Sequence, residues 1–185
     1  MQVVVGISGA SGSIYALRLL EVLRELDVEV NLIVTKVGER VITLETGLTR
    51  RDLATLAAHV YDIDDLTGPL SSGSCETNGM VVIPCSMKTL AGIAAGYSSN
   101  LLLRVADVAL KEKRPLVLVP RETPLSIIHL RNMYNVAQAG AVVLPAMPGF
   151  YNRPQSIEDL VNHIVGKILD VLGLEHHLYR RWEGI

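Results

Sequence analysis

Glycine, serine and threonine residues gather in two short segments that each stand just before a run of helix-forming residues. The first segment is Gly9-Ala10-Ser11-Gly12, and the second is Ser86-Met87-Lys88-Thr89. Glycine lets the backbone approach a ligand closely, and the N–H groups at a helix start attract phosphate. The first segment alone is equally consistent with a structural turn and a serine cap, and the second alone is better explained as a helix cap. Together they predict a site for one phosphorylated cofactor.

The glycine spacing argues against two common nucleotide sites. Gly6, Gly9 and Gly12 follow the pattern G-x-x-G-x-x-G, whereas the dinucleotide fingerprint is G-x-G-x-x-G and a P-loop ends in Gly-Lys-Ser/Thr. An NAD site also needs an acidic residue at the end of the second strand, where this chain has Thr35 and Lys36. We therefore expect a different nucleotide, or a phosphate or hydroxyl group, to bind near Thr35.

Several cations and one acid have the chemistry of an anion site. Arg121 and Glu122 stand side by side after a buried run, where arginine suits bidentate phosphate binding and glutamate suits general acid catalysis. Arg104 and Lys111 are seven residues apart and share a helix face, and Lys167 stands on a later helix. Taken singly, each of the three helical cations is better explained as a solvated surface group, and Arg121 with Glu122 is also consistent with a solvated loop pair. As a set they predict an anion site.

Metal and thiol chemistry have little support in the sequence. Cys75 and Cys85 form no C-x-x-C pair, and no histidine stands at a motif spacing from either. His176-His177 lacks the further ligands that a zinc site needs. We therefore expect no metal site and no cysteine nucleophile. The remaining histidines are interpreted as surface or core residues: His59, His129 and His163.

Length and composition predict one domain over residues 1–185. The chain is 49% hydrophobic with a net charge of −2, which provides no general attraction to nucleic acid or to an anionic membrane. No apolar run approaches the ~18 residues that span a bilayer, and the start lacks the basic region of a signal peptide. We expect a cytoplasmic protein. Aromatic residues make up only 4%, so the core must consist of Val, Leu, Ile and Ala, as in covered parallel sheets.

Short β-branched runs alternate with segments of helical periodicity. This order predicts an α/β fold, a three-layer doubly wound and mostly parallel sheet with helices on both faces. Three strands are expected to end at Pro84, Pro120 and Pro145, and ligands of such sheets bind at the carboxyl ends of the strands. The segment 145–154 looks like a rigid aromatic binding wall, and 62–78 like a flexible loop. The expected strands are 3–7, 28–34, 80–83, 115–119 and 141–144, and the expected helices are 12–26, 38–45, 87–95, 101–113, 126–138 and 157–172.

Six segments, in chain order, resemble the flavin prenyltransferases of the UbiX type. The most specific are V-P-R-E-T-P-L at 119–125 and P-G-F-Y at 148–151; the others are 9–12, 35–36, 86–89 and 106–111. The resemblance implies a flavodoxin-like, Rossmann-like domain that binds reduced FMN and assembles as a homododecamer. It also implies metal-independent transfer of a dimethylallyl group from dimethylallyl monophosphate to N5 and C6 of FMN. The prenylated FMN would then serve a UbiD-type decarboxylase.

The same resemblance assigns roles to individual residues. Ser11 would help the N5 proton leave, Glu122 would protonate the departing phosphate, and Glu45 matches a family glutamate near the prenyl site. Lys167 stands where other members carry arginine, and Leu66 where some carry tryptophan. The residues expected at FMN are Gly9, Ala10, Ser11, Thr35, Ser86, Met87, Lys88, Thr89 and Arg121, and those expected at dimethylallyl phosphate are Arg104, Lys111, Arg121, Glu122, Tyr151, Lys167 and Trp182.

Two alternatives remain open. An FMN-dependent cysteine-type decarboxylase of the same superfamily would need a catalytic histidine on an early helix and a P-x-M-N-x-x-M loop. This chain has no histidine before His59, and its loop reads Pro145-Ala-Met-Pro148. A non-catalytic flavin carrier would need only the FMN residues and would tolerate the loss of Glu122.

Overall fold

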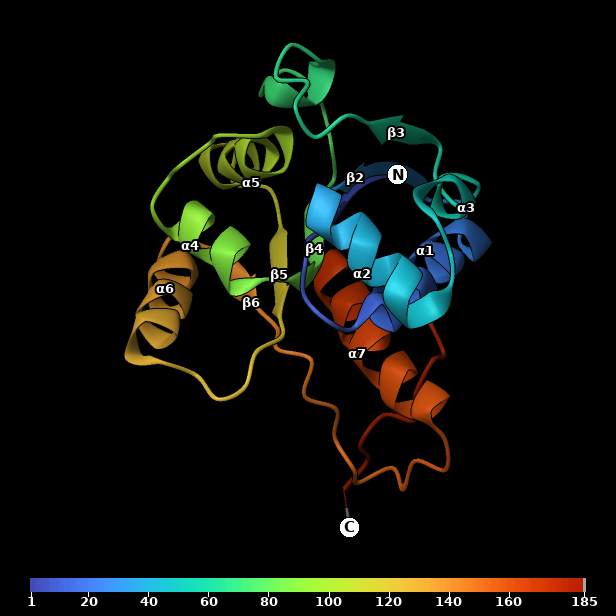
Figure 1. Cartoon of the computed structure of the whole chain (residues 1–185). Helices are drawn as coiled ribbons and strands as arrows, with labels where there is room; N and C mark the ends of the chain where they lie inside the picture. The colour runs from blue at the N-terminus through green and yellow to red at the C-terminus, as the bar shows by residue number, and fades with distance from the viewer. Residues whose placement is uncertain (185) are drawn as a thin grey trace.

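Six strands form one sheet in which every neighbouring pair runs parallel (Figure 1). The computed structural model describes residues 1–184. The strand order is β3-β2-β1-β4-β5-β6, with the chain crossing over after β3. The expected doubly wound parallel sheet is confirmed. The strands are β1 Gln2–Ile7, β2 Glu29–Val34, β3 His59–Tyr61, β4 Met80–Cys85, β5 Leu116–Pro120 and β6 Val142–Val143.

The helices begin at polar caps that the sequence supplies. Side chains of Thr35, Ser86, Asn100, Ser126 and Ser156 each accept a hydrogen bond from a backbone N–H of the first turn that follows. The helices are α1 Ser13–Glu25, α2 Lys36–Thr46, α3 Arg50–Ala54, α4 Met87–Ala94, α5 Leu101–Lys111, α6 Ile127–Gln138 and α7 Ile157–Leu172, with a 3₁₀ turn η1 at Pro69–Ser71.

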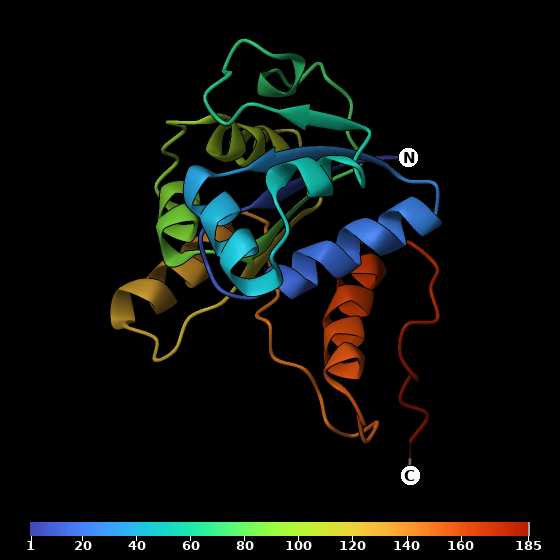
Figure 2. The same cartoon turned by 45° about the vertical axis from the view of Figure 1, so that its right-hand side comes forward.

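The core lies in two layers, one on each face of the sheet (Figure 2). Val3 and Val5 of β1 pack with α1 and α7, whereas Val4 packs on the other face with α4 and α5. This alternation follows from the two-residue period of a strand. No helix among residues 1–184 is long and apolar enough to cross a bilayer.

The structure differs from the sequence expectations in several elements. The short elements α3 and β3 were not expected, and the predicted flexible loop 62–78 contains η1. β4 continues through Pro84 to Cys85, and β5 includes Pro120. Proline is tolerated there because the end of a strand needs no further N–H donor on that side. The last strand is only two residues long, shorter than the predicted 141–144.

The chain after β6 extends beyond the sheet. Residues 145–156 leave the edge where β5 ends, α7 returns to cover the sheet, and residues 173–184 run back beside α7 (Figures 1 and 2). The side-chain amide of Asn152 donates to the carbonyl oxygen of Arg180 at 2.8 Å, so the two segments are joined. We call residues 145–156 and 173–184 the C-terminal arm.

Candidate functional site

The loops after β1 and β4 are joined by the buried hydroxyl of Ser8. Its Oγ donates to the carbonyl oxygen of Pro84 at 2.9 Å and accepts from the backbone N–H of Ser86 at 2.7 Å. Ser8 is 1% exposed, so these bonds are shielded from water. Ser8 was not among the expected site residues, because its partners lie 76 residues away.

The loop after β5 closes against the loop after β1. The Nε of Arg121 donates to the carbonyl oxygen of Ser11 at 3.3 Å, and the Arg121 backbone N–H donates to the carbonyl oxygen of Cys85, also at 3.3 Å. Glu122 is exposed beside it. Arg121 and Glu122 therefore stand at the carboxyl edge of the sheet, as the sequence predicted.

A carboxylate occupies the start of α1. Glu45 of α2 accepts from the backbone N–H groups of Ser13 at 2.8 Å and Gly12 at 3.0 Å. Burial alone raises the pKa of Glu45, but these hydrogen bonds outweigh it and hold the pKa below its usual value. Gly12 has a φ of 113°, which a side chain would strain. The first N–H groups of α1 therefore bond to Glu45 rather than standing free for a phosphate.

The start of α4 keeps free donors. The Ser86 Oγ accepts from the backbone N–H of Thr89 at 3.3 Å and donates to the Thr89 hydroxyl at 3.1 Å. The backbone N–H groups of Met87 and Lys88 have no partner within residues 1–184. These N–H groups, two hydroxyls and the Lys88 cation form a donor set that fits a phosphate. The structure brings one group of the predicted residues to this edge of the sheet: Gly9, Ala10, Ser11, Thr35, Glu45, Ser86, Met87, Lys88, Thr89, Arg121 and Glu122.

A second group lies in the C-terminal arm and on α7. The rings of Tyr151 and Trp182 meet edge to face with centroids 5.5 Å apart. Lys167 lies 3.4 Å from a carboxylate oxygen of Asp170 and 6.0 Å from the centre of the Tyr179 ring. The predicted ligands Tyr151, Lys167 and Trp182 thus gather in one aromatic and cationic cluster.

Two predicted ligands stand apart from both groups within one chain. The Nε of Arg104 donates to the carbonyl oxygen of Ser71 at 3.0 Å, and its guanidinium pairs with Asp107 at 2.7 Å. Lys111 pairs with Glu112 and lies beside Gly73. The shared helix face of Arg104 and Lys111 was predicted, but α5 directs both toward the segment 68–74.

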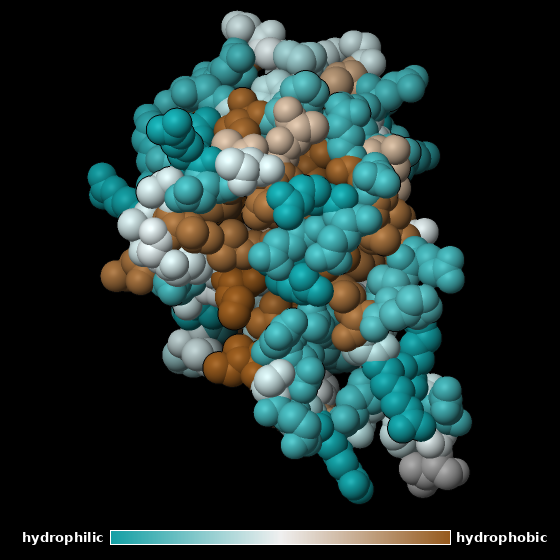
Figure 3. Space-filling model, turned by 90° about the vertical axis from the view of Figure 1, so that its right-hand side faces the viewer, coloured by the Kyte–Doolittle hydropathy of each residue, from teal (hydrophilic) through white to brown (hydrophobic). Residues whose placement is uncertain are grey.

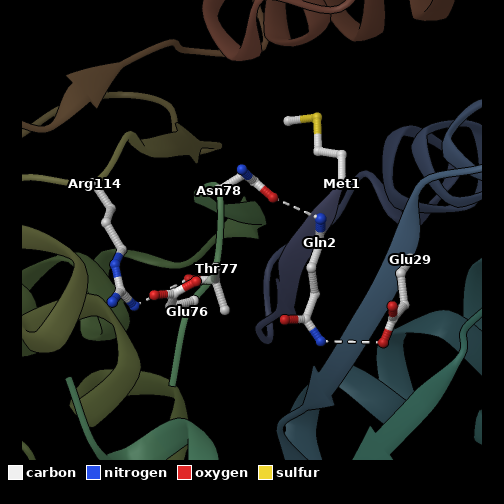
Figure 4. Close-up of a pocket in the computed structure, with 7 residues that line it drawn as sticks. All are labelled: Met1, Gln2, Glu29, Glu76, Thr77, Asn78 and Arg114. Atoms are coloured by element: carbon white, nitrogen blue, oxygen red, sulfur yellow. Dashed lines mark hydrogen bonds between the residues drawn. The ribbon is translucent and has the colours of Figure 1, made fainter. Parts of the chain in front are cut away.

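Two cavities of the described surface lie away from the predicted FMN residues. One of about 460 Å³ opens at the amino end of the strands and is lined by Gln2, Glu29 and Asn78 among others (Figure 4). Its one arginine, Arg114, is engaged by the carbonyl oxygens of Gly73 and Cys75. Another, of about 570 Å³, lies between the two segments of the C-terminal arm. The predicted FMN residues line neither of them.

The geometry can be compared with known proteins. Residues 1–169 match the family model described as Flavoprotein. The flavin prenyltransferase UbiX of Methanocaldococcus jannaschii is 48% identical over 98% of this chain and 98% of its own. The chain belongs to the UbiX-type flavin prenyltransferases within the Flavoprotein family. A probable UbiX-like flavin prenyltransferase of Escherichia coli O157:H7 is 50% identical over 100% of this chain and 94% of its own.

Solved UbiX-type structures agree with the fold. A dodecameric FMN-dependent UbiX-like decarboxylase from Escherichia coli O157:H7 superposes with a TM-score of 0.97 at 50% identity, covering 100% of both chains. AnUbiX (PadA1), solved with FMN and dimethylallyl pyrophosphate, gives 0.97 at 47% identity, covering 100% of this chain and 98% of that one. The predicted flavodoxin-like fold and UbiX family are confirmed. The peptidyl-cysteine decarboxylase EpiD, at 16% identity and a TM-score of 0.64, shares the fold alone.

Proposed function

We propose that this UbiX-type chain transfers a dimethylallyl group from dimethylallyl monophosphate to N5 and C6 of reduced FMN. The observation that carries the proposal is the junction of Ser11, Arg121 and the open start of α4 at one edge of the sheet. The family relatives support it, one of them solved with FMN and dimethylallyl pyrophosphate. The product would be used by a UbiD-type decarboxylase.

The FMN phosphate belongs at the start of α4. Ser86 and Thr89 offer hydroxyls, Met87 and Lys88 offer backbone N–H groups, and the Lys88 side chain adds positive charge. Gly9, Ala10 and Thr35 border the same space from the ends of β1 and β2. When bound, reduced FMN supplies the nucleophilic atoms of the reaction.

Ser11 and Glu45 form a proton-accepting pair. The Glu45 carboxylate lies next to Ser11, because it accepts hydrogen bonds from the backbone N–H groups of the two residues that follow, Gly12 and Ser13. A hydroxyl beside a carboxylate can accept a proton from a neighbouring N–H as the new bond forms, while its own proton passes to the carboxylate. We assign Ser11 to accepting the N–H proton and Glu45 to accepting the proton that Ser11 gives up.

Arg121 and Glu122 act on the leaving phosphate. Breaking the allylic C–O bond develops negative charge on phosphate and positive charge on the prenyl group, and fixed cations stabilise the former. Arg121 stands between the FMN loops and the phosphate, and Glu122 beside it donates the proton that phosphate needs to depart. Tyr151, Lys167 and Trp182 complete the donor site from the C-terminal arm and α7.

The separation of Arg104 and Lys111 supports an oligomeric site. Because both face the segment 68–74 and not the edge that holds Arg121, we assign them to the phosphate site of a neighbouring copy of the chain. Large apolar side chains such as Ile127, Phe150 and Trp182 are 72%, 69% and 58% exposed in the single chain. Figure 3 shows one face where apolar groups break up the hydrophilic surface. A homododecamer, the assembly named for the Escherichia coli O157:H7 structure, would bury such apolar side chains between its subunits.

The Glu122→Gln variant separates catalysis from flavin carriage. Wild type and variant are incubated without oxygen with reduced FMN and dimethylallyl monophosphate, and the extracted flavin is analysed by mass spectrometry. We expect equal FMN binding and at least about a hundredfold slower adduct formation by the variant, the usual scale for a lost general acid. Equal adduct formation would remove Glu122 from the reaction. Equal FMN binding with no adduct from either protein would favour the carrier.

A further inference from the structure

One face of α7 holds the C-terminal arm in place. His163, Gly166, Lys167 and Asp170 stand at helical spacing and point to the same side. Tyr179 packs over Gly166, where an added Cβ would lie 2.6 Å from its ring. The Tyr179 hydroxyl donates to the Asp170 carboxylate at 2.6 Å. The first of these residues, His163, reaches the other segment of the arm.

His163 contacts the P-G-F-Y segment with both ring nitrogens. The backbone N–H of Gly149 donates to Nδ1 at 3.0 Å, and Nε2 lies 3.5 Å from the hydroxyl oxygen of Tyr151. An imidazole that accepts at Nδ1 carries its proton on Nε2. The Nε2–H group therefore faces the Tyr151 oxygen, and the proton of the Tyr151 hydroxyl is left to donate to a different acceptor.

The surroundings keep the His163 ring neutral. Burial and then the nearby Lys167 cation lower the pKa of His163. The other titratable groups that face the ring are Tyr151 and Tyr179, whose rings meet it edge on at centroid distances of 5.9 and 5.0 Å. No carboxylate is among its hydrogen-bond partners in the part of the chain that the structure describes. A neutral ring is the form that the Gly149 contact requires.

Packing fixes Tyr151 against this ring. A Cβ at Gly149 would lie 2.8 Å from the Tyr151 ring and 3.4 Å from the His163 ring, so the glycine makes room for both. The Trp182 ring closes the other side of Tyr151. The tyrosine ring is thus confined, and what remains to be set is the direction in which its hydroxyl proton points.

We propose that His163 is a positioning residue that holds the 149–151 turn through Nδ1 and directs the Tyr151 hydroxyl proton toward the donor phosphate through Nε2–H. The proposal rests on the proposed function, since it takes Tyr151 as a phosphate ligand. It predicts that losing His163 weakens the binding of dimethylallyl phosphate while the binding of FMN stays unchanged.

Three substitutions separate the two contacts. His163→Phe keeps a ring and removes both nitrogens, His163→Asn keeps an acceptor near the Nδ1 position, and His163→Gln places an amide near the Nε2 position. We expect His163→Phe to raise the KM for dimethylallyl monophosphate about tenfold, the scale of one lost hydrogen bond to a charged group, with little change in kcat. His163→Gln should have a KM close to that of the wild type.

The double variant Tyr151→Phe/His163→Phe decides whether His163 acts through Tyr151. We expect its KM to equal that of Tyr151→Phe alone, because the hydroxyl that His163 directs is already gone. Multiplying effects, or an unchanged KM in His163→Phe, would overturn the proposal. A matched fall in kcat and FMN affinity in all three variants would also overturn it.

Hydrogen exchange of residues 147–152 in the ligand-free oligomer tests the loop without any activity. We expect the Gly149 amide to exchange faster in His163→Phe and to stay protected in His163→Asn. Unchanged exchange in His163→Phe would overturn the positioning role whatever the activity. If the Gly149 amide exchanges faster in His163→Phe but the wild type transfers no prenyl group, the proposed function is overturned. The result would still support the role of His163 in fixing residues 149–151.

Discussion

The Nε of Arg121 donates to the carbonyl oxygen of Ser11 at 3.3 Å, across 110 residues of sequence. This bond joins the loops that follow β1 and β5, two strands separated in the sheet by β4. It orients the guanidinium between the residues assigned to FMN and those assigned to the donor phosphate. A change at Arg121 should therefore affect both ligands.

Arg121→Lys should weaken FMN binding. Lysine keeps the charge but loses the planar fork that reaches the Ser11 carbonyl and a phosphate together, so we expect an increase in Kd of about tenfold. Titration of the protein with FMN, followed by flavin fluorescence, measures it. Arg131→Lys on the exposed side of α6 is the matched control and should leave the Kd unchanged. An equal Kd for Arg121→Lys and wild type would exclude Arg121 from the FMN site.

Ser8→Ala should destabilise the protein. The substitution leaves the buried Ser86 N–H without its 2.7 Å acceptor, and an unsatisfied buried donor costs about 1–3 kcal/mol. For a chain of this length that corresponds to a fall in Tm of about 2–12 °C. Thermal unfolding followed by circular dichroism is the measurement, with the exposed Ser72→Ala as control. A Tm equal to that of the control would show that the Ser8 bridge adds nothing.

Glu45→Gln should lower the Tm at neutral pH but not in acid. The pKa of Glu45 lies below its usual 4.5, so its stabilising effect is present above that value and is lost as pH falls through the lowered pKa. At pH 7 the variant should lose about 1 kcal/mol, the scale of a helix N-terminal carboxylate. The difference between wild type and variant should shrink below pH 4. A constant difference between pH 7 and pH 3.5 would contradict this origin.

Asp170→Asn should release the end of the chain. The Asp170 carboxylate accepts from Tyr179 at 2.6 Å, Arg181 at 2.7 Å and His176 at 3.1 Å. Burial alone raises the pKa of Asp170, but these hydrogen bonds keep the pKa well below its usual range. The carboxylate therefore stays ionised and keeps its three partners in mild acid.

Trypsin cleavage after Arg180 and Arg181 reports the release. We expect it to be several-fold faster in Asp170→Asn than in wild type, since local opening governs proteolysis. Asp27→Asn, at an exposed turn, is the control. Equal cleavage rates in Asp170→Asn and Asp27→Asn would mean that other contacts hold the arm.

Local patterns in the sequence predicted most of the elements. Buried β-branched runs marked the long strands, and Ser86 marked the start of α4 because capping depends on neighbouring residues only. β3 was not predicted because it has three residues, none of them fully buried, and so shows no alternation of apolar and polar side chains.

The site residues divide in the same way. The positions of Ser86 and Arg121 at the sheet edge were predictable because each directly follows a strand, and that of Ser11 because it lies in the short loop between β1 and α1. The bridging role of Ser8 was not predictable. Its partners Pro84 and Ser86 lie at the end of β4, and the local sequence pattern does not reveal that β4 lies beside β1. The sequence likewise contained the residues of the His163 contact, but only the fold brings α7 to Gly149.

The mass of the flavin after reaction tests prenyl transfer most directly. Purified protein is mixed with chemically reduced FMN and dimethylallyl monophosphate in the absence of oxygen, and the extracted flavin is weighed; parallel samples contain dimethylallyl pyrophosphate or no protein. We predict a flavin heavier by one C5H8 unit with the monophosphate, formed only when the protein is present. Unmodified FMN recovered from protein that binds it, with either donor, would contradict the assignment of this chain as a prenyltransferase.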